Sequence, residues 1–236
     1  MDGNKHNTII RVGGWAMLLF SILYVGTTLI IDQLAQSQVM LYSLKQHRLF
    51  EVVAGTPTIQ ALLIIYALLP LLLIPGAVGT YYAFKEHYAA NMRIAMYFTT
   101  IGVTALCMSL LMLPSLNWYL VTYILALPVT QQPSMIIILQ ALHCYLGVFI
   151  GDILGLGSLL VWFFITSLVM LYSRTISMVF GVILLILALC AAIVLTLWIM
   201  DYAPTIYSNV QVPGIVALWV FICGMGLISI HKKRAK

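Results

Sequence analysis

The stretch that decides the fold is residues 136–172, which reads IIILQALHCYLGVFIGDILGLGSLLVWFFITSLVMLY and contains one charged residue, Asp152. An α-helix rises about 1.5 Å per residue, so this run would be about 55 Å long, whereas the hydrocarbon layer of a bilayer is about 30 Å thick. So long an apolar run with a single charged residue is typical of a helix in lipid. The stretch therefore predicts a transmembrane helix with an overlong outer end.

Five further apolar stretches of about membrane-spanning length lie on either side of it, at approximately 12–31, 58–84, 94–113, 176–200 and 213–230. Charged residues make up 7% of the whole chain, against about 25% in ordinary soluble domains. So few charges could not cover the surface of a soluble domain, which indicates that lipid is the solvent for most of this chain. The sequence predicts an all-α, polytopic integral membrane bundle of six transmembrane helices, forming a single domain over residues 1–236.

The positions of the Lys and Arg residues predict how this bundle is oriented. With six spans and a cytoplasmic N-terminus, two cations fall outside, Lys45 and Arg48. The other nine fall inside, and they are Lys5, Arg11, Lys85, Arg93, Arg174, Lys232, Lys233, Arg234 and Lys236. This bias is typical of inner-membrane proteins, since cationic loops resist translocation. We therefore expect a multi-pass protein of the cell membrane, that of a bacterial inner membrane, with both termini cytoplasmic.

The same bias limits how the other features are interpreted. A seventh crossing within residues 136–172 would move the basic C-terminal tail outside and reverse the charge count, so one overlong helix is favoured. The cations act as topology signals along the cytoplasmic rim, and no nucleic-acid partner is expected. The expected partners are the lipid bilayer, a small lipophilic ligand, and a membrane-protein partner or a second copy of the chain.

Two outer loops are longer than a simple connection requires. Residues 32–55 mix apolar and charged side chains and predict an amphipathic segment on the outer surface. Residues 115–133 carry no charge, and their portion Trp118–Leu127 is too short to span a bilayer and too apolar for open water. We expect this portion to lie at the interface or to pack across the bundle.

Two prolines in the second span predict a kink. Pro70 and Pro75 lie inside the apolar run, and a proline removes a backbone hydrogen bond from a helix. Such breaks are tolerated in lipid where neighbouring groups satisfy the freed carbonyl. The four cysteines occur singly in apolar stretches, without metal-ligand or disulfide spacing. No metal site and no cofactor is predicted.

The fourth span carries both a packing motif and the only acidic residue well inside an apolar run. Gly147, Gly151 and Gly155 recur every four residues, and Ser158 extends the same face. Small residues at this spacing let another helix approach closely, which predicts a helix-packing seam. Asp152 borders that seam. A carboxylate in a membrane costs about 2.5–3.5 kcal/mol to insert at the helix centre, so Asp152 is a candidate polar or ligand site, with structural polar bonding as the alternative.

His143 is the second candidate polar residue of this span. Nine α-helical steps separate it from Asp152, which places the two side chains half a turn apart on a straight α-helix. Either residue could instead pair with a residue of another segment, and five candidates remain open: Tyr24, Gln60, Tyr66, Thr104 and Asn117. No catalytic residue is assigned.

Residues from Leu142-His143 through the glycines to Tyr172-Ser173-Arg174, followed by Val179-Phe180-Gly181, resemble a bacterial family of six-span membrane proteins catalogued as a domain of unknown function. The resemblance covers the whole chain in layout, and its specific part is about 40 residues. It implies the six-span fold and transfers no catalytic residue, because the family has no established activity.

Two classes of function remain compatible with the sequence. The favoured one is a non-enzymatic membrane protein that binds or moves a small lipophilic ligand, or acts as a partner in a membrane assembly. The alternative is a small intramembrane enzyme that uses Asp152 with groups from other spans. Catalysis would require a further acid, base or metal ligand near Asp152, and the sequence alone does not identify one.

The predicted topology can be tested with single reporter cysteines in a variant whose four native cysteines are replaced. Lys85→Cys and Lys236→Cys should resist an impermeant thiol reagent in intact cells, because both positions are expected in the cytoplasm. Gln46→Cys should react, since residue 46 is expected outside. Labelling of the Lys236→Cys variant would overturn the six-span arrangement.

Overall fold

The computed structural model describes residues 3–37, 57–128, 130–173, 178–200 and 211–234. Every regular element within these residues is a helix, which confirms the all-α prediction. The elements are α1 (Gly3–Ser37), α3 (Pro57–Leu68), η1 (Leu69–Leu72), α4 (Leu73–Leu111), η2 (Leu113–Asn117), α5 (Trp118–Ala126), α6 (Gln132–His143), η3 (Cys144–Leu156), α7 (Gly157–Tyr172), α8 (Met178–Met200) and α9 (Gln211–Arg234). Of the expected outer segment 32–55, residues 32–37 belong to α1 and the remainder lies outside the described residues.

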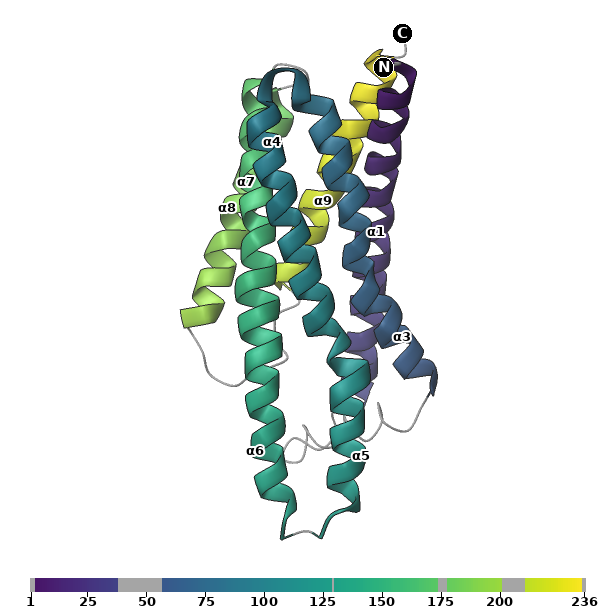
Figure 1. Cartoon of the computed structure of the whole chain (residues 1–236), viewed down its shortest axis with the longest axis vertical. Helices are drawn as coiled ribbons and strands as arrows, with labels where there is room; N and C mark the ends of the chain where they lie inside the picture. Colours follow the sequence, from purple (N-terminus) through teal and green to yellow (C-terminus); the bar gives the residue numbers. More distant parts are fainter. Residues whose placement is uncertain (1–2, 38–56, 129, 174–177, 201–210, 235–236) are drawn as a thin grey trace.

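The helices run side by side along one long axis (Figure 1). α4 consists of two arms, because Tyr88 has a non-helical backbone conformation (φ −129°, ψ 32°) and the chain turns back at this point. α1 begins and α9 ends at the same end of the bundle as this turn (Figure 1). At that end Lys85 of α4 contacts α1, because its Nζ lies 3.1 Å from His6 Nε2. The same Nζ lies 4.6 Å from the centroid of the Tyr82 ring.

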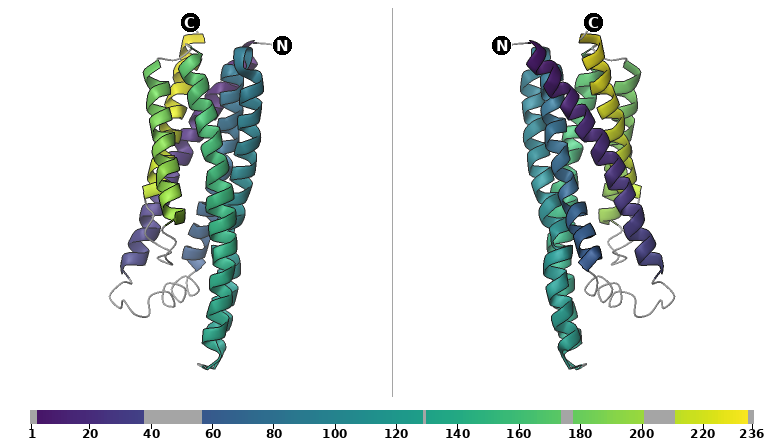
Figure 2. Two further views of the ribbon diagram at one scale, coloured as in Figure 1. Left: turned by 90° about the vertical axis from the view of Figure 1, so that its left-hand side faces the viewer. Right: turned by 90° about the vertical axis from the view of Figure 1, so that its right-hand side faces the viewer.

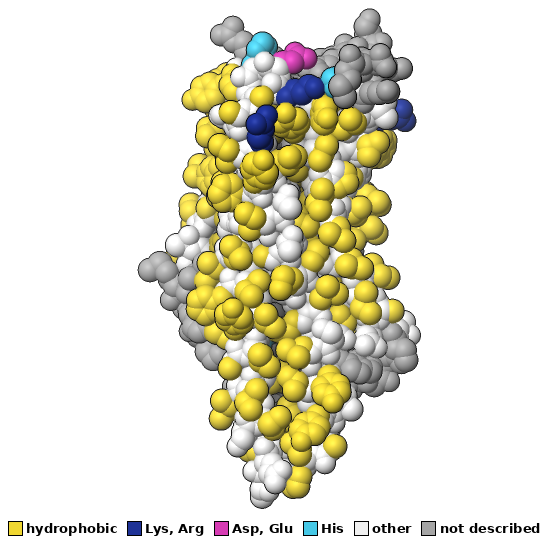
Figure 3. Space-filling model, in the orientation of Figure 1, with side chains coloured by type: hydrophobic (Ala, Val, Ile, Leu, Met, Phe, Trp, Pro, Cys, Tyr) yellow, Lys and Arg dark blue, Asp and Glu magenta, His cyan; other side chains and the backbone are white. Residues whose placement is uncertain are grey.

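Four helical runs in the described residues are long and apolar enough to cross a membrane: His6–Ile31, Thr58–Leu116, Gln132–Tyr172 and Met178–Leu197. Gly214–Ile230 is a shorter apolar helix. The flanks of the bundle expose many large apolar side chains, among them Ile22 (63% exposed) and Leu197 (60%). In Figure 3 apolar side chains cover most of the visible face, and Lys and Arg side chains gather near one end. Such a surface is suited to lipid, which needs no hydrogen bonds from the side chains that it contacts.

The overlong segment 136–172 lies in one continuous rod formed by α6, η3 and α7. The rod Gln132–Tyr172 has 41 residues, which corresponds to about 60 Å at an α-helical rise. Figure 2 shows that α6, together with α5, extends beyond the other helices at one end of the bundle. Ser173 ends the rod with a backbone N–H that donates to Val169 O at 2.9 Å.

Trp118–Leu127 does not pack across the bundle, which was one of the two expected arrangements. α5 instead continues the line of the second arm of α4, through the π-helical turn η2, and pairs with α6 as a hairpin (Figure 1). The physical reason is a small apolar cluster between the two helices, in which Ile124 and Leu139 are buried and Leu120 and Met135 pack against them. This shared apolar face orients α5 along α6.

Pro70 lies in a 3₁₀ segment near the middle of the second apolar run. η1 (Leu69–Leu72) interrupts the α-helix there, between α3 and α4. Proline has no N–H, so Pro70 cannot donate to the Tyr66 carbonyl four residues earlier, and the α-helical bond at that point is missing. Pro75 lies within the first turn of α4, where an absent N–H costs little. The break is therefore associated with Pro70.

A close crossing of three helices lies between the turn at Tyr88 and this break. A Cβ on Gly13 of α1 would lie 2.8 Å from the Gly79 Cα and 2.7 Å from the Pro75 carbonyl oxygen of α4. A Cβ on Gly224 of α9 would lie 3.0 Å from the carbonyl oxygen of Gly14. Only glycine permits such an approach, since in each case the neighbouring atom belongs to the backbone and cannot rotate away.

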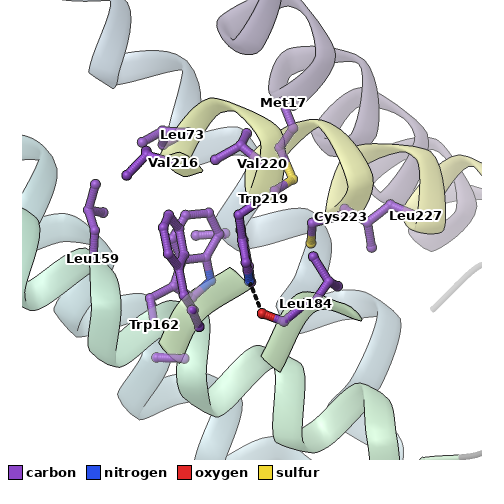
Figure 4. Packing of buried hydrophobic residues seen from close by; sticks show 14 of the residues in the cluster. Met17, Leu73, Leu159, Trp162, Leu184, Val216, Trp219, Val220, Cys223 and Leu227 are labelled. Atoms are coloured by element: carbon purple, nitrogen blue, oxygen red, sulfur yellow. Dashed lines mark hydrogen bonds between the residues drawn. The ribbon is translucent and has the colours of Figure 1, made fainter. Parts of the chain in front are cut away.

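The core on the other side of α9 is built around Trp219, which is fully buried (Figure 4). Its Nε1 donates to the Leu184 carbonyl of α8 at 3.0 Å and lies 3.3 Å from Ser167 Oγ of α7. Its ring stacks on Phe163 with 3.9 Å between the centroids. These contacts join α7, α8 and α9, and Gly181 of α8 meets the backbone of α7 at Leu171.

The glycine crossing generates a matched pair of substitutions on α1. Gly13→Ala should lower the thermal unfolding midpoint in detergent by several degrees, because overpacking of a tight contact typically costs about 1–3 kcal/mol. Gly26→Ala should leave the midpoint unchanged or raise it, since no atom lies within 4 Å of its Cβ position and alanine is the better helix former. Equal midpoints for the two variants would contradict the crossing.

Candidate functional site

Asp152 lies in η3, a π-helical segment packed mainly on α4. A π-helix has hydrogen bonds from residue i to i+5 and a wider turn than an α-helix, and such segments frequently occur at functional sites. The Asp152 side chain is half-buried, whereas the flanking Ile153 (38%) and Leu154 (49%) are exposed. Asp152 thus lies at the boundary between the bundle interior and the apolar outer surface.

Two tyrosines from other helices lie near Asp152. Tyr24 of α1 and Tyr66 of α3 stack their rings with 5.3 Å between the centroids and an interplanar angle of 10°. Tyr66 and the Asp152 carboxyl both interact electrostatically with the Tyr24 hydroxyl. We call Asp152, Tyr24 and Tyr66 the Asp152 cluster. It unites three segments that are far apart in the sequence.

Phe20 positions the cluster from the interior side. It is 2% exposed and stacks on Tyr24 with 5.0 Å between the ring centroids, so Phe20, Tyr24 and Tyr66 form a row of three rings. The row fixes the direction of both tyrosine side chains, because stacked rings cannot turn independently. Tyr66 also lies four residues before Pro70, which has no N–H to donate to the Tyr66 carbonyl oxygen.

The structure selects among the five candidate partners that the sequence left open. Asp152 interacts electrostatically with Tyr24, and Tyr66 stacks on Tyr24. Gln60 instead donates from Nε2 to the Pro114 carbonyl at 3.1 Å, and Thr104 donates to the Thr100 carbonyl of its own helix at 2.9 Å. The Asn117 side chain lies outside the described residues.

His143 ends α6, and its ring lies over Gly147, 3.3 Å from the position that a Cβ would occupy. The half-turn separation expected between His143 and Asp152 assumed α-helical steps, and η3 is π-helical, so that angular argument does not hold. Along the rod the two residues remain nine positions apart. His143 is therefore described by its contact with Gly147, and not as part of the Asp152 cluster.

The glycine stripe of η3 faces the second arm of α4. A Cβ on Gly151 would collide with Ser109, and a Cβ on Gly155 would lie 3.0 Å from Leu106 Cγ. Ser109 Oγ donates to the Gly147 carbonyl at 3.4 Å, and Ser158 is buried. A Cβ on Gly102 of α4 would in turn lie 2.9 Å from the Gly155 carbonyl oxygen. These contacts hold η3 against α4 and so fix the position of Asp152.

Other chemistry is limited in the part of the chain that the structure describes. No group of three or more His, Cys, Asp or Glu residues there could hold a metal ion. The four cysteines are free, with Cys107 and Cys223 buried. Two buried donors of α7, Trp162 Nε1 and Thr166 Oγ1, have no hydrogen-bond partner among the described residues, and each such atom costs about 1–3 kcal/mol.

No family model, curated protein or solved structure matches this chain. The site is accordingly interpreted from its own geometry. That geometry offers one carboxyl, two linked hydroxyls and a carbonyl at a helix break.

The seam between η3 and α4 generates a second matched pair of substitutions. Gly151→Leu should lower the unfolding midpoint in detergent, because the new side chain would have to displace Ser109. Gly157→Leu should have little effect, since no atom lies within 4 Å of its Cβ position. If Gly151→Leu unfolded at the same temperature as Gly157→Leu, the seam would not be tightly packed.

Proposed function

We propose that this protein is a six-span protein of the bacterial inner membrane that binds or moves a small lipophilic ligand at the Asp152 cluster. The observation that carries the proposal is the stack of Tyr24 on Tyr66, four residues before Pro70 in the interrupted helix, together with the electrostatic interaction of Asp152 with Tyr24. Ligand sites in membrane bundles are typically formed where helices are interrupted and a few polar groups converge. Membership of the six-span family that the sequence resembles is part of the same proposal.

The arrangement of charges supports the proposed topology, with both termini in the cytoplasm. The described Lys and Arg residues occur at the beginning of α1, around the turn of α4 and at the end of α9. These three places lie at one end of the bundle (Figure 1). The positive-inside rule assigns that end to the cytoplasm.

The depth of the cluster supports access from the bilayer. Asp152 lies 20 residues before Tyr172, which corresponds to about 30 Å, or one hydrocarbon thickness. The cluster is thus expected near the outer boundary of the membrane. A half-buried carboxyl flanked by lipid-exposed side chains can be reached by a ligand that is itself dissolved in the bilayer.

A small intramembrane enzyme remains the second candidate, and one observation favours it. The tyrosine hydroxyls supply the further acid groups near a carboxyl that catalysis would require. An enzyme would convert a bound lipophilic compound to a product detectable by mass spectrometry, whereas a binding or transport protein would release it unchanged.

Ligand binding can be tested with two lipophilic probes, n-decanol and decyltrimethylammonium, added to the protein in lipid nanodiscs. A ligand that binds the folded state raises the unfolding midpoint saturably. At least one probe should do so for the wild type. The double variant Tyr24→Phe/Tyr66→Phe should lose much of the effect, because both hydroxyls that the ligand would contact are removed.

The control for this measurement is Gly26→Ala, which lies on the same helix as Tyr24 and has open space around its Cβ position. It should respond to the probes as the wild type does. If neither probe stabilises the wild type beyond its effect on empty nanodiscs, the proposed function is wrong.

A further inference from the structure

Three side chains join α1 to the first arm of α4 at the end of the bundle where α4 turns back (Figure 1). Lys85 Nζ lies 3.1 Å from His6 Nε2 and 4.6 Å from the centroid of the Tyr82 ring. The centroids of the His6 and Tyr82 rings are 5.1 Å apart. We call Lys85, His6 and Tyr82 the Lys85 cluster. All three side chains are half-buried, so a group outside the bundle can reach them.

The glycine crossing holds the Lys85 cluster in place. Gly13 and Gly79 bring the backbones of α1 and α4 together. His6 precedes Gly13 by seven residues, and Lys85 follows Gly79 by six. The two helices run in opposite directions (Figure 1), so both residues lie on the same side of the crossing, about 10 Å from it. An incoming group meets a cluster that is already assembled, and little ordering cost opposes its binding.

The chemistry of the Lys85 cluster favours a negatively charged group that accepts hydrogen bonds. An ammonium has three N–H donors and no acceptor, and His6 Nε2 can take one of the three. The Tyr82 hydroxyl is a further donor. Two exposed cations, Arg11 and Arg93, lie at the same end of the bundle, where Glu86 supplies one exposed carboxylate among the described side chains. The described side chains of this end therefore attract an anion.

The face of α4 that carries Lys85 continues along the helix as an apolar strip. Ile74, Val78 and Tyr81 precede Lys85 by eleven, seven and four residues, and these spacings place all four side chains on one side of an α-helix. Ile74 is 38% exposed, and Val78 and Tyr81 are half-buried. The strip is about 16 Å long. It is open to the lipid along its length and has a cation at one end.

We propose that the Lys85 cluster binds the phosphate of an anionic phospholipid. The phosphate accepts from the Lys85 ammonium beside Tyr82, and an acyl chain lies along Val78 and Ile74. Basic sites between transmembrane helices on the cytoplasmic side are suited to such headgroups, and the proposed topology assigns this end of the bundle to the cytoplasm. A soluble phosphate compound would use the charge but not the apolar strip. This site is separate from the Asp152 cluster and does not depend on the ligand proposed there.

The test compares three compounds added to the purified protein in a neutral detergent: dioctanoyl phosphatidylglycerol, dioctanoyl phosphatidylcholine and inorganic phosphate. Apparent affinities come from the saturable rise of the unfolding midpoint. The wild type should bind phosphatidylglycerol about fivefold or more tightly than phosphatidylcholine, the scale of one cation near an anionic headgroup. Inorganic phosphate should give no saturable rise over the same concentrations. Equal affinity for the two lipids, or an equal response to inorganic phosphate, would overturn the proposal without any variant.

Substitutions at Lys85 locate the binding site. Lys85→Gln should weaken binding of phosphatidylglycerol by about fivefold or more and leave binding of phosphatidylcholine nearly unchanged. Lys85→Arg keeps the charge and should retain most of the affinity for phosphatidylglycerol. The matched control is Arg93→Gln, which removes an exposed cation five residues beyond the turn at Tyr88 and should have the smaller effect. Equal losses in Lys85→Gln and Arg93→Gln, or no loss in Lys85→Gln, would overturn the proposal.

Discussion

Gly13 of α1 lies so close to Gly79 of α4 that a Cβ on Gly13 would be 2.8 Å from the Gly79 Cα, and the other elements are positioned by this approach. Water does not drive two apolar helices together inside a bilayer, so their association depends on close van der Waals packing and on hydrogen bonds between helices. The crossing brings α1 against α4, and Gly14 with Gly224 brings α9 against α1. Because these contacts fix the position and rotation of α1, they also fix where Tyr24 lies along the bundle and in which direction its side chain points.

The second half of the bundle is joined by different chemistry. Trp219 of α9 donates to the Leu184 carbonyl of α8 and stacks on Phe163 of α7, so a single large side chain connects three helices. An indole N–H in an apolar core needs an acceptor, and here it finds a backbone carbonyl and the Ser167 hydroxyl. The glycine seam then holds η3 on α4.

The helix break and the polar cluster have a common physical basis. Pro70 interrupts the second apolar run and has no N–H to donate to the carbonyl of Tyr66, the residue that also contributes its ring to the cluster. An interrupted helix in lipid is tolerated only where nearby groups satisfy the freed backbone, so polar side chains and helix breaks are expected together. This is why the cluster, and not His143, is the stronger candidate site.

The sequence by itself determined the features that depend on local composition. Apolar runs between isolated cations predicted an all-helical fold, Pro70 predicted the break, and the absence of other charges between Arg93 and Arg174 singled out Asp152. These predictions need only the hydropathy, backbone chemistry and charge of neighbouring residues. The sequence also named Tyr24 and Tyr66 as possible partners, but it did not distinguish them from Gln60 or Thr104.

The tertiary structure decided which helix faces meet. It stacked Tyr24 on Tyr66, turned Gln60 toward Pro114, and placed α5 along α6 rather than across the bundle. It also showed the Gly13–Gly79 crossing, for which the glycines Gly13 and Gly14 in one helix and Gly76 and Gly79 in the other were the signal in the sequence. An apolar helix in lipid has no polar face that indicates its orientation. Its rotation is set by the shapes of its neighbours, and those contacts form only in the folded bundle.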